Sequence, residues 1–156
     1  MDEKKLLKYA VDYLSKYNSS KKNLINVLKR KIFRSEISNF EKSKLINFID
    51  NIIIKLEKNK FIDDYRYSST KILSLSNAGK SKNFIFNYLI KKGIDRLQIQ
   101  DNLNLIYKDN KDWELESAKI FVKKKRLFGK NNSYEKNMAK MARAGFSYDI
   151  CKKILG

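Results

Sequence analysis

Apolar residues recur at intervals of three and four along most of the chain, which is the spacing of one face of an α-helix. Stretches with this spacing run from Leu6 to Leu14, Leu45 to Leu56, Ile85 to Leu89, Ile99 to Ile106 and Ile120 to Leu127. The pattern predicts amphipathic helices joined by short connections.

Three segments align without a gap, which indicates an internal repeat of about 50–60 residues. They begin at Ser20, Ser81 and Ser133 and read SKKNLINVLKRKIF, SKNFIFNYLIKKGI and SYEKNMAKMARAGF. An apolar residue follows each serine after eight positions, a cation after ten and another apolar residue after thirteen. The matching residues are Leu28, Leu89 and Met141; Arg30, Lys91 and Arg143; and Phe33, Ile94 and Phe146. Six positions before the serines stand Leu14, Leu75 and Leu127.

Each repeat is predicted to be a module of three helices. The serine suits a helix N-cap, and Gly93 and Gly145 suit the residue after a helix end, where the backbone adopts positive φ. The first repeat has Ile32 at the corresponding position, so its second helix is expected to end differently. The predicted modules span residues 1–62, with an insertion near 38–44 before the third helix, then 63–110 and 111–156.

The composition favours an all-α chain. There is no proline and there are five glycines, whereas sandwiches and barrels need many turns. No apolar run is long enough to cross a membrane, and the start lacks the apolar core of a signal peptide. Cys151 is the only cysteine and there is no histidine, so disulfides, zinc sites and histidine triads are not expected. We expect a cytoplasmic protein without a cofactor.

The charge indicates a polyanionic partner or an acidic protein surface. The sequence has 35 Lys and Arg against 17 Asp and Glu, a formal net charge of +18. The densest basic run is KIFVKKKRLFGK, residues 119–130. On a helix, one stripe would be formed by Lys119, Lys123, Arg126 and Lys130, with Lys124 and Lys125 beside it. Such a stripe suits phosphates, and the alternative is a solvated helix face.

Three other cations recur at one position of the repeat, namely Arg30, Lys91 and Arg143. They are either equivalent contact points for a partner or cations that complement a helix dipole in the last turn. The tetrapeptide AGKS at 78–81 is not expected to be a phosphate loop, because Ser74 stands where that loop needs glycine.

Residues 61–68 read FIDDYRYS and contain the adjacent carboxylates Asp63 and Asp64. They are the only candidate for an acid pair that does chemistry, and no set of metal ligands accompanies them. We predict that they are structural, that one of them caps the following helix, and that Arg66 pairs with one of them. Tyr67 is expected to pack at the same joint between two modules. No enzymatic activity is predicted.

Three blocks of this sequence resemble the RecX family, bacterial regulators of the RecA recombinase. The blocks are FIDDYRYS, GKSKNFIFNYLIKKGID and ARAGFSYDICKKIL, and the similarity extends from about Leu6 to Leu155. Family members typically carry glycine where this chain has Lys60 and Ile32, so the turns at these positions are expected to differ.

The resemblance implies an elongated, curved array of three tandem three-helix modules. It also implies binding to RecA–DNA filaments, with inhibition of filament growth, ATP hydrolysis and strand exchange, and contact with single- or double-stranded DNA without sequence preference. A monomer with no membrane association is expected. The alternative is a stand-alone helical protein that binds DNA nonspecifically, for which the charge alone would suffice.

Overall fold

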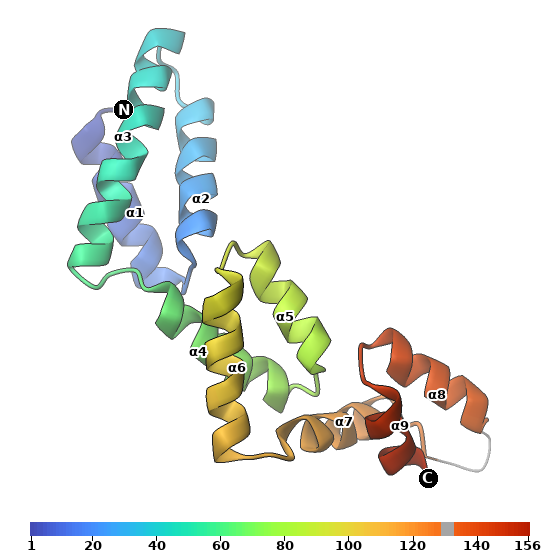
Figure 1. Cartoon of the computed structure of the whole chain (residues 1–156). Helices are drawn as coiled ribbons and strands as arrows, with labels where there is room; N and C mark the ends of the chain where they lie inside the picture. The colour runs from blue at the N-terminus through green and yellow to red at the C-terminus, as the bar shows by residue number, and fades with distance from the viewer. Residues whose placement is uncertain (129–132) are drawn as a thin grey trace. The chain divides into compact units, whose positions relative to one another are not determined.

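The computed structural model describes residues 1–128 and 133–156, which contain nine helices and no strand (Figure 1). The helices are α1 (Glu3–Lys16), α2 (Lys21–Arg34), α3 (Asn39–Lys58), α4 (Asp64–Asn77), α5 (Lys82–Lys91), α6 (Arg96–Asp109), α7 (Trp113–Lys124), α8 (Tyr134–Arg143) and α9 (Tyr148–Leu155). The all-α class predicted from periodicity and composition is confirmed.

The chain folds as two compact units. Unit 1 comprises residues 1–67 together with 92–94, and unit 2 comprises residues 68–91 together with 95–156. The finer division into three modules, at the boundaries given above, stays a prediction.

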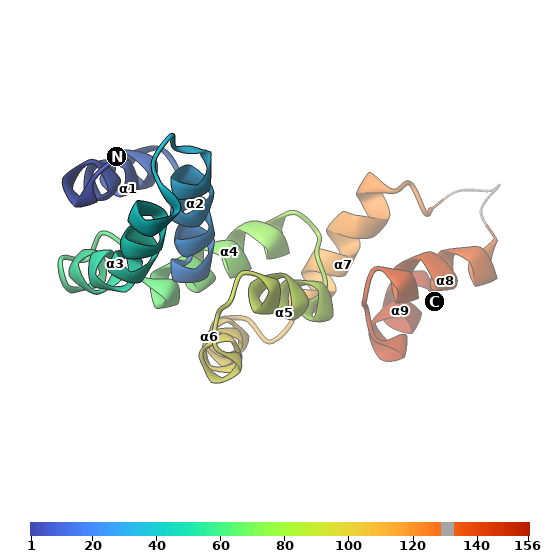
Figure 2. The same cartoon turned by 90° about the horizontal axis from the view of Figure 1, so that it is seen from above.

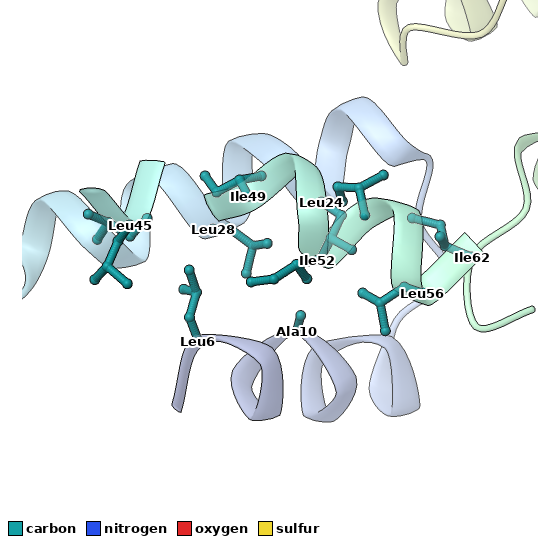
Figure 3. Packing of buried hydrophobic residues seen from close by; sticks show 11 residues of the cluster. Leu6, Ala10, Leu24, Leu28, Leu45, Ile49, Ile52, Leu56 and Ile62 are labelled. Carbon is teal, nitrogen blue, oxygen red and sulfur yellow. The ribbon is translucent and has the colours of Figure 1, made fainter. Parts of the chain in front are cut away.

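The core of unit 1 lies between α1, α2 and α3, which are side by side in both views (Figures 1 and 2). Figure 3 shows Leu6 and Ala10 of α1 facing side chains from α2 and α3. The buried residues from these two helices include Leu24, Leu28, Leu45, Ile49, Ile52 and Leu56. Each fully buried Leu or Ile side chain contributes about 1.5–3 kcal/mol relative to exposure, so this apolar face holds the three helices together.

The last three helices pack around a smaller core in unit 2. Its buried members are Ala118, Val122, Leu127, Met141, Phe146 and Cys151. The rings of Phe121 and Phe146 lie 5.5 Å apart. Trp113, the first residue of α7, is buried. Burial raises the pKa of the Cys151 thiol.

Helix α2 ends differently from α5 and α8, as Ile32 predicted. Helices α5 and α8 stop two residues before Gly93 and Gly145, whose φ angles are +81° and +98°. Ile32 is instead a buried residue inside α2, which continues to Arg34.

The extra residues of the first repeat do not form a connection before α3, so their predicted placement is wrong. Residues 39–44 are the first turns of α3 itself. Ser38 and Glu41 form a reciprocal capping box there, which satisfies two backbone donors and starts the helix earlier in the sequence.

The turn at the end of α3 places Lys60 in a backbone conformation that usually requires glycine. Phe61 N donates to Leu56 O at 2.9 Å and Lys60 N donates to Glu57 O at 3.0 Å, which is the Schellman arrangement. That arrangement requires positive φ at Lys60, and its φ is +60°. A side chain with a Cβ costs about 1–2 kcal/mol in this conformation, so the turn is formed under backbone strain.

Lys60→Gly is therefore expected to raise the free energy of unfolding by about 1 kcal/mol, because glycine adopts positive φ without steric cost. Urea unfolding followed by far-UV circular dichroism measures the change. Lys58→Gly, within the last turn of α3, is the matched control and should lower stability by about 0.5–1 kcal/mol. A loss of stability in both variants would contradict the assignment of strain to Lys60.

Candidate binding surfaces

The basic run at 119–130 does not form one helical stripe. Helix α7 ends at Lys124, and Arg126 has a φ of +54°, outside the helix. The prediction that Arg126 continues the face of Lys119 and Lys123 is therefore wrong, and Lys130 lies outside the described residues.

The physical reason for this early end is Leu127. Its backbone N–H donates to Val122 O at 3.0 Å, and its side chain is buried in the core of unit 2. This burial folds the chain back over the last turn of α7, in the same arrangement as at the end of α3. Leu127 therefore lies after a helix, whereas Leu75 lies within α4, and the shared offset of these two leucines is not a structural equivalence.

Part of the basic run remains together. Lys119 and Lys123 are exposed and lie four residues apart on α7, hence on one face. Lys124 donates from Nζ to Ala78 O at 3.3 Å, just beyond the C-terminal end of α4. Lys125 and Arg126 are exposed. These residues stay candidates for contact with an anionic partner.

The three recurring cations are all exposed, but they do not occupy equivalent helix positions. Lys91 and Arg143 are the last residues of α5 and α8, where a cation complements the helix dipole. Arg30 lies four residues before the end of α2, because α2 is longer. The dipole explanation is thus weaker for Arg30 than for the other two.

Asp63 caps α4, as predicted for one of the two carboxylates. Its Oδ1 accepts hydrogen bonds from Tyr65 N at 2.9 Å and Arg66 N at 3.2 Å. The predicted ion pair of Arg66 is absent from the part of the chain that the structure describes, so that expectation is wrong. Tyr67 is buried one turn later, in agreement with a packing role.

Asp64 does not cap its own helix but the start of α2. Its Oδ1 accepts from Lys21 N at 2.9 Å, and the Lys21 Nζ lies 2.8 Å from Glu57 Oε2. Burial raises the pKa of Asp64, and the hydrogen bond from Lys21 acts against this rise. The hydrogen bond to Glu57 raises the pKa of Lys21. Both carboxylates of the acid pair are thus committed to backbone donors.

The N-cap serines make a second hydrogen bond that links distant segments. Ser20 donates from Oγ to Lys92 O at 2.7 Å within unit 1. Ser81 donates to Ala144 O, also at 2.7 Å, within unit 2. In each case the acceptor lies just beyond the end of a later second helix of the repeat. Each serine hydroxyl therefore joins the start of one helix to the end of another.

The acidic contact is repeated in unit 2 by a residue that the alignment did not match. Lys82 N, at the start of α5, donates to Glu114 Oε2 at 2.9 Å, as Lys21 N does to Asp64. Glu114 is the second residue of α7 and Asp64 the first residue of α4. The signal in the sequence that could have revealed the equivalence of Asp64 and Glu114 is an acidic residue in the first turn of both α4 and α7.

Neither a metal site nor a phosphate loop accompanies these contacts. Among residues 1–128 and 133–156, no group of three or more His, Cys, Asp or Glu could hold a metal ion. Gly79 has a φ of +86° and closes α4, and Ser81 Oγ accepts from Phe84 N at 3.1 Å as the cap of α5. In the same described ranges, no helix has the length and apolar character needed to cross a membrane.

Comparison with solved structures identifies the fold. A crystal structure of RecX from Lactobacillus salivarius matches with a TM-score of 0.71 and 24% sequence identity, covering 97% of this chain and 93% of that one. A second RecX crystal structure matches with a TM-score of 0.72 at 22% identity. The all-helical repeat is therefore the RecX fold.

Sequence relatives support the same assignment, although no family model matches the chain. The regulatory protein RecX of Myxococcus xanthus is 28% identical over 154 residues, which cover 94% of this chain and 81% of that protein. The regulatory protein RecX of Finegoldia magna is 32% identical over 155 residues, which cover 94% of this chain and 68% of that protein. With this identity spread over nearly its whole length, the chain belongs to the RecX family of regulatory proteins.

Proposed function

We propose that this protein regulates the RecA recombinase by binding RecA–DNA filaments, where it opposes filament growth, ATP hydrolysis and strand exchange. Membership of the RecX family is the observation that carries the proposal. The mechanism is occupancy: a basic array of helices contacts several filament subunits and hinders their addition or conformational change. Several weak contacts on one chain add up to strong binding.

Charge and the state of the carboxylates support a binding protein rather than an enzyme. The net charge of +18 suits a filament that carries DNA phosphates. Asp63 and Asp64, the one candidate acid pair, accept hydrogen bonds from backbone N–H groups and hold helix starts. A catalytic carboxylate must instead reach a substrate proton.

The test is the DNA-dependent ATPase activity of RecA. The protein, added below the RecA concentration, is expected to suppress ATP hydrolysis and strand exchange by at least half. The same assay without DNA measures the background. Unchanged hydrolysis and strand exchange at equimolar protein would refute the proposal.

A charge-reversal variant locates the contact. Lys119→Glu with Lys123→Glu, which share the exposed face of α7, should raise the concentration needed for half-inhibition about tenfold, because each phosphate contact contributes to affinity. The matched control is Lys4→Glu with Lys8→Glu, two exposed lysines four residues apart on α1. Equal losses in both variants would assign the effect to net charge.

The second candidate is nonspecific DNA binding without RecA, which the same net charge favours. In that case affinity for DNA alone falls steeply with salt. Tight DNA binding together with an unchanged RecA ATPase would favour this candidate.

A further inference from the structure

A groove between α1 and α2 in unit 1 is lined by cations and tyrosines. Its volume is about 310 Å³, and its lining consists of Tyr9, Tyr13, Val27, Arg30, Lys31 and Arg34. No acidic side chain belongs to this lining. Two of the six arginines of the chain stand in it, and arginine is the side chain that best matches the oxygens of a phosphate.

The length of α2 builds this groove. Val27, Arg30, Lys31 and Arg34 follow one another at helical intervals of three, one and three residues, so they share one face of α2. Arg34 is on that face only because α2 continues through Ile32. The corresponding residues of the other repeats, Asp95 and Ser147, lie after the glycines, at the N-cap positions of α6 and α9.

In the part of the chain described, neither Arg30 nor Arg34 donates a hydrogen bond to a carbonyl at the end of α2. Ile32 O accepts from both the backbone N–H and the hydroxyl of Ser35. Phe33 O accepts from Lys42 Nζ at 3.0 Å. Two of the last four carbonyls of α2 thus have donors other than the groove cations.

Arg30 and Arg34 are exposed, and neither has an ion-pair partner in the part of the chain described. Lys31 Nζ lies over the ring of Tyr9, 5.0 Å from its centroid. Three cations held on two turns of one helix repel one another, and an anion between them removes that repulsion.

The tyrosines favour a phosphate over a stacked base. Lys31 covers the ring of Tyr9, and the ring of Tyr13 tilts against that of Tyr17 at 4.9 Å. The Tyr13 hydroxyl accepts from Asn23 Nδ2 at 3.3 Å, so its own hydrogen is available as a donor. The groove therefore offers charge and hydroxyl donors rather than a free aromatic face.

We propose that the α1–α2 groove binds a phosphodiester group of a nucleic-acid backbone. Arg30 and Arg34 donate to the phosphate oxygens, and Lys31 and Tyr13 complete the site. The inference rests on the proposed function and deepens it by naming a DNA contact in unit 1. Its assay contains no RecA, so a negative result here is distinguishable from failure of the RecA proposal.

The experiment measures binding of a fluorescein-labelled 20-nucleotide oligo(dT) by anisotropy over a range of salt concentrations. Arg30→Gln with Arg34→Gln should weaken binding about tenfold or more and reduce the slope of log affinity against log salt by about 1.4, since each single-strand phosphate contact contributes about 0.7. Arg30→Lys with Arg34→Lys keeps the charge but loses the planar fork, and should weaken binding about threefold.

The matched control is Lys8→Gln with Lys29→Gln, exposed lysines of α1 and α2 outside the lining. Equal weakening in the control and the arginine variant, or an unchanged salt slope, would overturn the proposal.

Two further probes distinguish the source of the anion. Pyrophosphate that binds as tightly as the oligonucleotide would indicate a free-phosphate site. If the arginine variant lost binding to polyglutamate but kept its binding to the oligonucleotide, the groove would instead bind an acidic protein segment. Either result would overturn the nucleic-acid assignment.

Discussion

Leu28→Ala is expected to lower the free energy of unfolding by about 2–5 kcal/mol. Leu28 lies on α2, is fully buried, and points into the core between α1 and α3 (Figure 3). The variant removes apolar contacts and leaves a cavity that three packed helices cannot close. Because a domain is stable by only about 5–15 kcal/mol, a loss of this size unfolds part of the population at physiological temperature.

Urea unfolding followed by far-UV circular dichroism gives the change, and native-state hydrogen exchange shows whether the amides of α2 and α3 lose protection. Ile54→Ala is the matched control, since Ile54 on α3 is 64% exposed. Its stability should stay within about 0.5 kcal/mol of the wild type. A small effect of Leu28→Ala would show that unit 1 is not held by the core described above.

The spacing of apolar residues and the residues that start and end helices predicted most of the secondary structure. The apolar spacing identified the helices because each buries one face, and the serines at 20 and 81 mark helix starts because their hydroxyls accept backbone N–H groups. The glycines at 93 and 145 mark helix ends because only glycine adopts positive φ without cost. These signals are local in sequence, which is why one sequence suffices to read them.

Several features that the sequence did not reveal depend on contacts between distant residues. The end of α7 depends on burial of Leu127 in a core completed by α8 and α9. The role of Asp64 depends on Lys21, 43 residues away, and the hydroxyl of Ser81 reaches Ala144 across 63 residues. The α1–α2 groove was missed for the same reason, since it forms only where cations of α2 pack beside tyrosines of α1.

Gly79→Ala is expected to lower the free energy of unfolding of unit 2 by about 2–5 kcal/mol. Gly79 has a φ of +86°, where an added Cβ costs about 1–2 kcal/mol. That Cβ would also stand 2.9 Å from the backbone nitrogen of Phe121 and 3.1 Å from Ile120 Cγ2. A backbone atom inside α7 cannot move aside as a side chain can, so crowding adds about 1–3 kcal/mol.

Gly156→Ala separates the two contributions. Gly156 has nearly the same φ, +85°, but an added Cβ there meets no atom within 4 Å. The cost there should be the conformational part alone, at most about 1–2 kcal/mol. Trp113, the only tryptophan, is the first residue of α7 and reports on unit 2 through its fluorescence, while circular dichroism follows both units.

Equal losses in the two variants would mean that the approach of α4 to α7 at Gly79 adds nothing to stability. A larger loss at Gly79 would establish that this glycine is required for the close packing of α7, and hence for the position of Lys119 and Lys123 on its exposed face.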